Sequence, residues 1–530
     1  MKPRTTGISE QSRVSAPRLS LGHLGVALFV GADLMLASHF VVYLKFALAA
    51  IPYPYQLDYG EGIVWQQALL IPGQRMYGDI TKYPFIVFHY PPLYHLLARG
   101  VAALGPDLLT TGRAISAAST VATAVLVTRL ALDATRVDAG RLAALVGASI
   151  AGLSVFCYWP IVVWSPLFRV DMLAVVLSFF GVWCAVRSGG RLVWLSAAFM
   201  IFVLAGFTKQ TCVAAPLSTF AIMLFLYRAD ALKALIPGLL FCAAGLLVME
   251  WATSGGFLRH IVFYNVNRYN LHRAFVNMLQ VYPNAVFVLL AVVALCFGWR
   301  RTAVQDKGSL AGLRHNLLSS RSALTMAVLT AYFVASSIVT LISVGKSGAA
   351  YNYFIEWLCV TSVLVGACVT HLLHMANTWM PRTSIPETIA ILVVPILLML
   401  QVAILPGSAS SVFQISDATR NARLDQLVTK VARASKPVLS DDMVILLRAG
   451  REVPWEPAVF SELASTGRWD ERLITNMIWS REFAYIITTG YPGQHEYDSR
   501  YDPDVTRAIE ASYPYTVEYA GRVVHRPAAQ

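Results

Sequence analysis

Charged residues are scarce in this sequence. Only 14% of the 530 residues are Asp, Glu, Lys or Arg, whereas 56% are hydrophobic, and the mean hydropathy is +0.57. A typical soluble domain has about 25% charged residues. The composition therefore excludes an ordinary soluble protein of several domains and predicts a polytopic α-helical membrane protein.

Two other features are missing. The seven cysteines lie in apolar runs without CxxC or Cys/His spacing, which argues against a zinc site or a disulfide framework. Internal repeats and low-complexity tracts are also absent, and this weakens the alternative of a transporter built from inverted repeats.

Long apolar runs make up most of the chain. A spanning helix needs about 20 mostly apolar residues, and about eleven such runs are present. The expected spans are roughly 22–50, 113–133, 141–163, 171–187, 191–208, 211–227, 234–252, 281–299, 323–343, 352–373 and 386–406.

The basic residues indicate the orientation in the membrane. The net charge is +12, and Lys and Arg gather in alternate connections, most densely between Arg300 and Arg321, as the positive-inside rule requires for cytoplasmic loops. This accounts for the positive charge without a nucleic-acid partner. With residues 1–21 as a cytoplasmic tail, an odd number of spans places 407–530 outside the cytoplasm.

Three parts follow the tail. Residues 22–406 are expected to form the transmembrane domain, in which 51–112 is a first outer loop with an interfacial helix at 92–104, too short to span. Residues 407–530 are expected to form a small α/β domain, with a helix in 415–434 and strands in 436–441, 483–490 and near Tyr515 and Val523.

Threading the chain through the membrane gathers polar residues on the outer side. Ionisable groups near membrane depth are costly and generally line a cavity or pair with one another, so they are functional candidates. Carboxylates act as general bases or metal ligands, and Lys or Arg holds a phosphate leaving group. The candidates are Asp58, Tyr59, Glu61, His89, Arg169, Asp171, Lys209, Arg268, Arg273, Lys346, Asn352 and Glu356.

Short motifs among these residues resemble one family. DYGEG (58–62), a YGD turn and YPPLY in 51–95, then RVD (169–171), TKQT (208–211) and NYF (352–354) are similar to the bacterial branch of the GT-C glycosyltransferases, which resembles protein mannosyltransferases and the aminoarabinose and galacturonic acid transferases of lipopolysaccharide.

The resemblance implies roles for individual positions. Asp58 matches the aspartate of the first outer loop that acts as catalytic base, and Asp171 matches the acidic residue of the next outer loop. Lys209 matches a basic residue in the donor-phosphate region. His89 precedes the Pro-Pro pair near a metal ligand of some relatives, so a divalent ion held by Asp58, His89 and Asp171 is an open alternative. The DYGEG motif leaves open whether Glu61 is a second catalytic carboxylate or a structural one.

For the family as a whole, the resemblance implies an inverting hexosyl- or pentosyltransferase of the bacterial inner membrane. Its donor is a polyprenyl-phosphate sugar, and its acceptor is a hydroxyl of a cell-envelope glycan, lipid or protein. Arg169, Arg268, Arg273 and Lys346 are further candidates for the donor phosphate. His89, Tyr59, Asn352 and Glu356 are candidates for the substrate cavity.

Structural explanations compete for each acidic or basic residue. Asp58 and Glu61 are also explained as solvated loop residues. Asp171 is equally placed to pair with Arg169 or to cap the following helix, and Lys209 to extend from a helix end toward water.

Other polar residues favour a structural role. His89 lacks a partner at ligand spacing, and the NVNRYNLHRAF segment is equally explained as a wet outer loop. Asp441 and Asp442 are expected on solvated surface, although they follow a strand. Asp33, inside the first apolar run, needs a partner or a proton there, and no role is assigned to it.

Three other functional classes compete with the transferase. The gathering of acids and bases at one membrane surface favours the transferase over a transporter, which predicts helices broken at the midplane. A ligase or polymerase of lipid-linked glycans shares such a site and is the alternative function. A noncatalytic scaffold would not need these groups.

Overall fold

Each of the eleven apolar runs contains a helix. The structure is a computed structural model that describes residues 21–135, 140–265, 267–305, 309–377 and 385–528. The helices are α1 (Leu21–Ala50), α4 (Leu108–Thr135), α5 (Arg141–Ser154), α7 (Asp171–Arg187), α8 (Leu192–Thr208), α9 (Ala214–Tyr227), α10 (Ala229–Ala252), α13 (Ala285–Gln305), α15 (Arg321–Ser343), α16 (Ile355–Asn377) and α17 (Ile385–Ile404).

The expected single helix over 141–163 is wrong. Helix α5 ends at Ser154, and the short helix α6 (Trp159–Trp164) follows with Pro160 in its first turn. Proline has no backbone N–H to donate into a continuous helix and its ring clashes with the preceding turn. The chain therefore stops and restarts inside this apolar run.

Shorter helices connect the long ones. They are α11 (Gly256–Leu258), η1 (Arg259–Phe263), α12 (Leu271–Met278), η2 (Leu279–Asn284), α14 (Leu310–Ser319) and η3 (Tyr351–Phe354).

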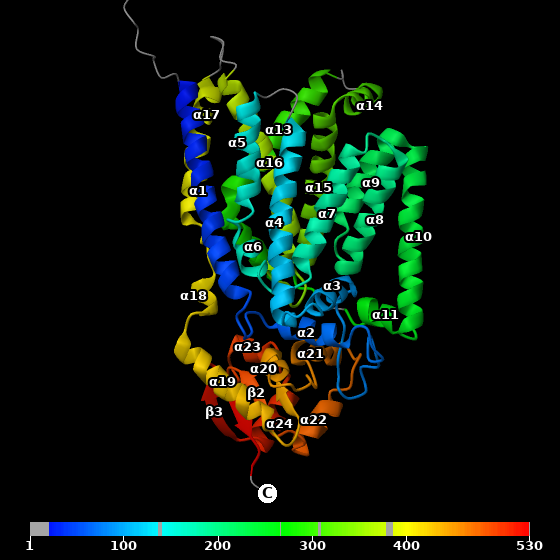
Figure 1. Cartoon of the computed structure of the whole chain (residues 1–530), viewed down its shortest axis with the longest axis vertical. Helices are drawn as coiled ribbons and strands as arrows, with labels where there is room; N and C mark the ends of the chain where they lie inside the picture. The colour runs from blue at the N-terminus through cyan, green and yellow to red at the C-terminus, as the bar shows by residue number, and fades with distance from the viewer. Residues whose placement is uncertain (1–20, 136–139, 266, 306–308, 378–384, 529–530) are drawn as a thin grey trace, which may run out of the picture.

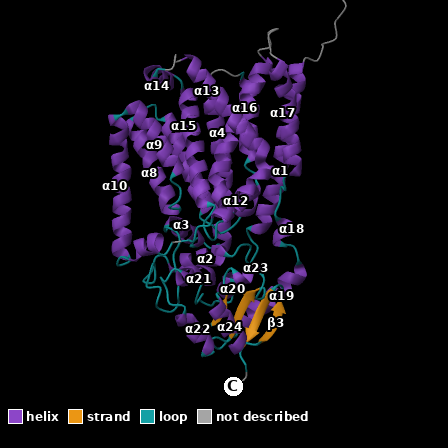
Figure 2. Cartoon of the chain, turned by 180° about the vertical axis from the view of Figure 1, so that it is seen from behind, coloured by secondary structure: helices purple, strands orange, loops and turns teal. Residues whose placement is uncertain are grey.

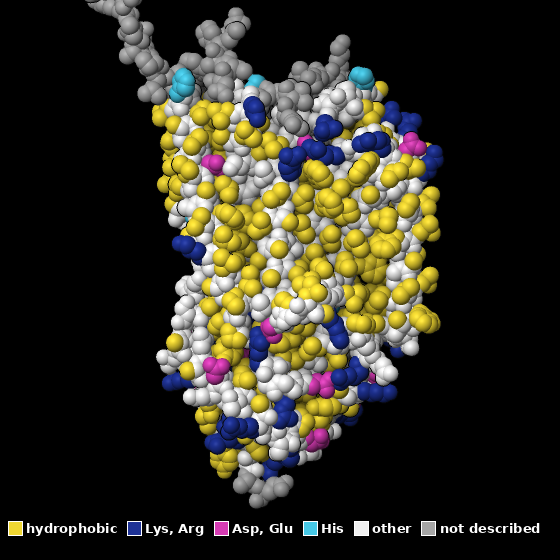
Figure 3. Space-filling model, viewed as in Figure 1, with side chains coloured by type: hydrophobic (Ala, Val, Ile, Leu, Met, Phe, Trp, Pro, Cys, Tyr) yellow, Lys and Arg dark blue, Asp and Glu magenta, His cyan; other side chains and the backbone are white. Residues whose placement is uncertain are grey.

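The helical bundle makes the chain a multi-pass membrane protein. Figure 3 shows hydrophobic side chains covering the middle of the bundle, with Lys and Arg gathered toward its ends. Within the described residues, six stretches are long and apolar enough to cross a membrane: His23–Ala50, Leu108–Thr135, Ala229–Ala252, Leu271–Cys296, Arg321–Ser343 and Tyr351–Met375. Four shorter apolar helices, Arg141–Ser154, Leu192–Thr208, Ala214–Tyr227 and Ile389–Ile404, accompany them.

The small mixed domain expected at the C-terminus is observed. Its sheet has the order β1-β2-β4-β3, with β1 and β2 parallel and the other pairs antiparallel. The four strands lie where the sequence predicts them. The elements are α18 (Ser410–Phe413), α19 (Ala418–Ala432), β1 (Val438–Ser440), α20 (Met443–Arg448), α21 (Pro457–Ser465), α22 (Arg472–Trp479), β2 (Tyr485–Thr489), α23 (His495–Asp498), α24 (Pro503–Ser512), β3 (Tyr515–Tyr519) and β4 (Arg522–Arg526).

Helices cover both faces of this sheet. Side chains alternate across a strand, so Val438 and Ile487 join one core with Leu427 of α19. Leu439 and Ile486 join the other core, with side chains from α21, α22 and α24.

The first loop lies between the bundle and the C-terminal domain (Figures 1 and 2). It contains α2 (Gly60–Leu70) and α3 (Leu93–Ala102), and the latter is the short helix predicted at 92–104. Helix α2 packs closely on α20 at Gly62. A Cβ at this position would lie 2.5 Å from Cβ of Met443, so only glycine permits the contact. The backbone N–H of Phe85 donates to the carbonyl of Pro454 at 2.8 Å. The loop is therefore held against the C-terminal domain at two points.

Two predictions concern residues outside the described ones. The expected cytoplasmic tail, 1–21, lies outside them except for Leu21, and so does Lys307 of the expected basic loop.

Two glycines allow α5 and α16 to pack closely. A Cβ at Gly366 would lie 2.5 Å from the carbonyl oxygen of Gly147 and 2.6 Å from Cβ of Ala151. A side chain at Gly366 would therefore force the two helices apart, since packed interiors have no spare volume.

Gly366→Leu should therefore destabilise the bundle. Overpacking costs typically about 1–3 kcal/mol, so we expect a lower Tm in detergent, measured by intrinsic fluorescence. Gly206→Ala in α8 is the matched control, because no atom lies within 4 Å of a Cβ there. An unchanged Tm for Gly366→Leu would contradict this account of the packing.

Candidate active site at the first loop

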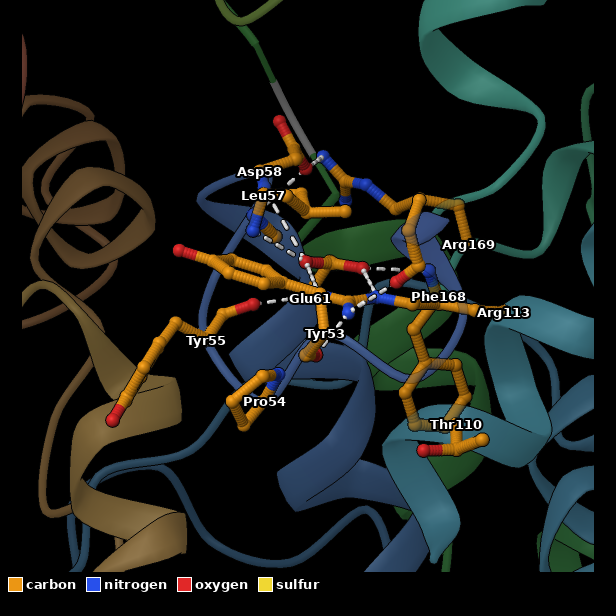
Figure 4. A network of polar contacts seen from close by, with 12 residues as sticks. Tyr53, Pro54, Tyr55, Leu57, Asp58, Glu61, Thr110, Arg113, Phe168 and Arg169 are labelled. Atoms are coloured by element: carbon orange, nitrogen blue, oxygen red, sulfur yellow. Dashed lines mark hydrogen bonds and ion pairs between the residues drawn. The ribbon is translucent and has the colours of Figure 1, made fainter. Parts of the chain in front are cut away.

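A fully buried ion pair organises the first loop. Arg113 of α4 donates through Nε to Oε1 of Glu61 at 2.7 Å, and through Nη2 to Oε2 at 2.7 Å. Its other bonds reach the carbonyls of Ala50 at 2.9 Å, Tyr53 at 2.5 Å and Tyr55 at 2.7 Å. All five guanidinium donors are thus used, and Figure 4 shows them converging on Glu61 and the loop backbone.

Both carboxylate oxygens of Glu61 are fully hydrogen-bonded. Besides Arg113, its oxygens accept from the backbone N–H of Phe168 at 2.9 Å and of Leu57 at 2.8 Å, and the residue is 0% exposed. Burial alone would raise the pKa of Glu61, but Arg113 and these hydrogen bonds hold it below its ordinary value. Glu61 is therefore an ionised anchor.

Asp58 has a different environment although it lies three residues away. Its Oδ1 is 2.5 Å from Nη2 of Arg169 and accepts from the backbone N–H of Gly60 at 3.0 Å. Within the described residues, Oδ2 has no hydrogen-bond partner, and 21% of the side chain is exposed. Burial raises the pKa of Asp58, and Arg169 opposes this only in part.

Gly60 makes the approach of Arg169 possible. A Cβ at this position would overlap the guanidinium of Arg169. The guanidinium also lies over the ring of Trp164, 4.9 Å from the ring centroid.

Asp171 begins α7 and binds three side chains. Its Oδ1 accepts from Nζ of Lys209 at 2.6 Å and from Nδ2 of Asn352 at 3.0 Å. Its Oδ2 accepts from Nε1 of Trp164 at 2.8 Å. The expected pairing of Asp171 with Arg169 is therefore wrong: Asp171 pairs with Lys209 and Arg169 pairs with Asp58. Asp171 lies in the first turn of α7, and within the described residues no side chain caps that helix.

A pocket adjoins this group. Asp171, Lys209, Asn352 and Glu356 line it, together with small polar residues of α15. Glu356 accepts from the hydroxyl of Tyr332 at 2.6 Å. The pocket is thus lined by a cation, an amide and two carboxylates.

The C-terminal domain reaches the same loop through Glu456. The Tyr59 hydroxyl donates to Oε1 of Glu456 at 2.7 Å, and Nε2 of His89 lies 3.8 Å from its Oε2. Within the described residues, no group of three His, Cys, Asp or Glu side chains is placed to hold a metal ion. Asp58, His89 and Asp171 therefore do not form a three-ligand set.

The remaining basic candidates lie elsewhere. Arg268 approaches Glu462 of α21 at 3.9 Å and is 62% exposed. Its backbone carbonyl accepts from the N–H of Ser347 at 2.7 Å, and the backbones of Tyr269 and Lys346 form an isolated antiparallel β-bridge. Neither Lys346 nor the exposed Arg273 pairs with a described acid.

Two acidic residues predicted on solvated surface are buried, so that prediction is wrong. Asp441 pairs with Arg500 and Asp442 with Arg522, each at 2.7 Å. Asp33 accepts from the hydroxyl of Ser149 at 3.0 Å.

Sequence reasoning missed Arg113 and Glu456. Arg113 opens an expected span, and an Arg at membrane depth is a functional signal that predicts a buried acidic partner. Glu456 has no local signal, because its contacts with Tyr59 and His89 arise only from docking of the C-terminal domain.

Comparisons with known proteins establish the fold. No protein-family model matches the chain, and no curated protein sequence is significantly similar to it. Among solved structures, ArnT from Cupriavidus metallidurans bound to undecaprenyl phosphate is 13% identical, with a TM-score of 0.52 over 94% of this chain and 98% of that one. ArnT in the apo state is 12% identical, with a TM-score of 0.53 over 96% and 100%.

A more distant likeness is to the archaeal oligosaccharyltransferase AglB from Archaeoglobus fulgidus, which is 12% identical with a TM-score of 0.44 over 92% of this chain and 74% of that one. At these identities the likeness concerns the fold. Over nearly its whole length, the chain therefore has an ArnT-like fold.

Proposed function

We propose that this protein is an inverting glycosyltransferase that moves a sugar from a polyprenyl-phosphate donor to an acceptor hydroxyl at the outer face of the membrane. The observation that carries the proposal is the Asp58 carboxylate, which is fixed through Oδ1 by Arg169 and Gly60 and has its second oxygen unpartnered among the described residues.

Asp58 fits a general base better than the other two acids. A base must accept a proton, and a pKa nearer the working pH improves its efficiency. The pKa of Asp58 is raised, whereas the pKa of Glu61 is lowered by Arg113. Asp171 is only 2% exposed, and Lys209 already occupies one of its oxygens.

Lys209 fits the donor phosphate. Its ammonium lies at the pocket, 5.4 Å from the ring centroid of Tyr353, and an ammonium is a suitable point charge for phosphate. ArnT, whose fold this chain shares, has been solved with undecaprenyl phosphate, which supports a lipid-phosphate donor here. Arg268, Arg273 and Lys346 would then hold the outer part of the headgroup.

The chemistry balances without another reactant. Asp58 takes the proton of the acceptor hydroxyl, whose oxygen attacks the anomeric carbon from the face opposite the phosphate. The bond between that carbon and the phosphate oxygen breaks, and the lipid phosphate leaves with the electron pair. Arg169 holds Asp58 toward the acceptor, and Asn352 and Glu356 contact sugar hydroxyls.

The proposed orientation follows from the basic loops. Eleven spans with the N-terminus in the cytoplasm put the first loop and residues 407–530 on the outer side. The donor would enter between bundle helices from the lipid, and the acceptor would enter between the first loop and the C-terminal domain. A bacterial inner membrane is proposed from the family resemblance of the sequence motifs.

Asp58→Asn should abolish most transfer without unfolding the protein. Loss of a general base costs typically about 10²–10⁴-fold in kcat. Transfer is measured by mass spectrometry with envelope extracts as acceptor and a panel of polyprenyl-phosphate hexoses and pentoses as donors. Asp79→Asn is the matched control, since Asp79 is an exposed acid of the same loop bonded to Thr81. Full activity of Asp58→Asn would refute its role as base.

Glu61→Gln should act on stability instead. Breaking a buried ion pair costs about 3–5 kcal/mol, so Tm should fall well below that of Asp58→Asn. The lowered pKa of Glu61 means that the pair stabilises the fold above the ordinary carboxyl pKa, and that this stability is lost as pH falls through the lower folded value. Wild type should lose more Tm on acidification than Glu61→Gln; equal losses would contradict the assignment.

Lys209→Gln should weaken donor binding. Losing one hydrogen bond to a charged group costs about 1.5–3 kcal/mol, which is roughly ten- to hundredfold in Kd. The probe is undecaprenyl phosphate, titrated onto the detergent-solubilised protein. Asp171→Asn combined with Lys209→Gln removes both buried charges, so a loss of affinity in this double variant as well shows that an unpaired Asp171 is not the cause. Lys82→Gln, at an exposed lysine of the first loop, serves as the control. Unchanged affinity in Lys209→Gln would exclude it as the phosphate ligand.

A further inference from the structure

The side chain that follows Asp58 leaves the first loop and inserts into the C-terminal domain. The Tyr59 hydroxyl donates to Oε1 of Glu456 at 2.7 Å and accepts from the backbone N–H of Ala458 at 3.2 Å. The guanidinium of Arg500 lies over the Tyr59 ring, 4.4 Å from its centroid. The phenol is thus held at its edge and on its face.

The groups that hold Tyr59 are themselves fixed. Arg500 donates to Asp441 at 2.7 Å, and Asp441 accepts from both the N–H and the hydroxyl of Thr489 at the end of β2. Glu456 caps α21 by accepting from the N–H of Val459 at 3.3 Å. Tyr59 is therefore bound to the rigid part of the domain.

The backbone around Asp58 has no regular structure between Tyr53 and Leu57. Arg113 fixes the carbonyls that precede Asp58, and Tyr59 is the first anchored side chain after it. The backbone of Asp58 thus lies between one anchor in the bundle and one in the C-terminal domain.

We propose that docking of the C-terminal domain sets the position of the Asp58 carboxylate through Tyr59, which makes Tyr59 and Glu456 positioning residues for the transfer reaction. This inference rests on the proposed role of Asp58 as base. A displacement of about 1 Å can cost roughly 10²-fold in rate, so the anchor acts on kcat more than on donor affinity.

Glu456 also connects this anchor to the other end of the loop. Its second oxygen, Oε2, lies 3.8 Å from Nε2 of His89. The carbonyl of His89 accepts from the side chain of Gln210 at 2.9 Å, next to Lys209. One carboxylate of the domain therefore stands between the segments that carry the base and the phosphate ligand.

The test separates the hydrogen bond from the packing. Tyr59→Phe keeps the ring over Arg500 and removes the bond to Glu456. We expect kcat to fall roughly ten- to hundredfold, with the donor KM unchanged because Lys209 is not altered. Glu456→Leu, which also removes the cap of α21, should lose at least as much, whereas Glu456→Gln, which retains an acceptor for the hydroxyl, should keep most of the wild-type kcat.

A double variant tests whether the two residues act together. Tyr59→Phe combined with Glu456→Leu should lose no more activity than Glu456→Leu alone, because the bond between the two residues is already removed in that variant. Arg75→Gln is the matched control. It breaks an exposed ion pair between the same loop and Glu452 of the same domain, and kcat should stay at the wild-type value.

Two outcomes overturn the inference. The first is wild-type kcat in Tyr59→Phe, and the second is an equal loss in Glu456→Gln and Glu456→Leu, since that would mean that the charge and not the bond matters. Asp58→Asn is assayed in parallel. If Asp58→Asn is inactive while Tyr59→Phe is fully active, the positioning role of Tyr59 is refuted and the proposed function stands. If Asp58→Asn is fully active, the role of Asp58 as base is refuted.

Discussion

The bond between Arg113 and Glu61 is the constraint on which the site depends. Taking both charges out of water is costly, and the cost is offset only when every donor and acceptor is satisfied. Here the five guanidinium donors meet the Glu61 carboxylate and three carbonyls of the loop. The pair therefore does what no apolar contact does: it fixes the backbone of an irregular segment in one conformation.

That conformation separates two neighbouring acids. The N–H groups of Leu57 and Phe168 saturate Glu61, while the turn into α2 directs Asp58 toward Arg169. Gly60 is needed at this turn because the guanidinium occupies the space of a side chain. One carboxylate becomes part of the scaffold, and the other keeps an oxygen without a partner among the described residues.

Much of the fold could be predicted from the sequence, because apolar runs of spanning length have few alternatives to helices. The break before Trp159 was missed, since Pro160 lies within an unbroken hydrophobic run and hydropathy ignores backbone donors. The sheet strands were also predictable from β-rich runs between turn residues.

The site was only partly predictable. Threading gathers Asp58, Asp171 and Lys209 on one surface, but which acid pairs with which base depends on geometry that spacing does not encode. The contact of Tyr59 with Glu456 joins residues 397 positions apart, and no periodicity connects them. Similarly, Asp441 is buried because it pairs with Arg500, whereas two successive acids after a strand are usually expected on the solvated surface.

The pairing of each acid with its own cation bears on how the proposed reaction ends. In the proposed reaction, Asp171 would share Lys209 with the donor phosphate. Trp164 and Asn352 also donate to Asp171, so the carboxylate would keep two hydrogen bonds when the ammonium turns toward the phosphate. A sugar-phosphate diester carries one negative charge, but the lipid phosphate that leaves is a monoester, whose charge is about −1.5 to −2 at pH 7. The attraction of Lys209 and the repulsion of Asp171 for the phosphate would therefore both grow as the bond from the anomeric carbon to the phosphate oxygen breaks. In the proposed reaction, Lys209 would counter the charge that develops on the leaving phosphate, and Asp171 would hold the ammonium in position for it.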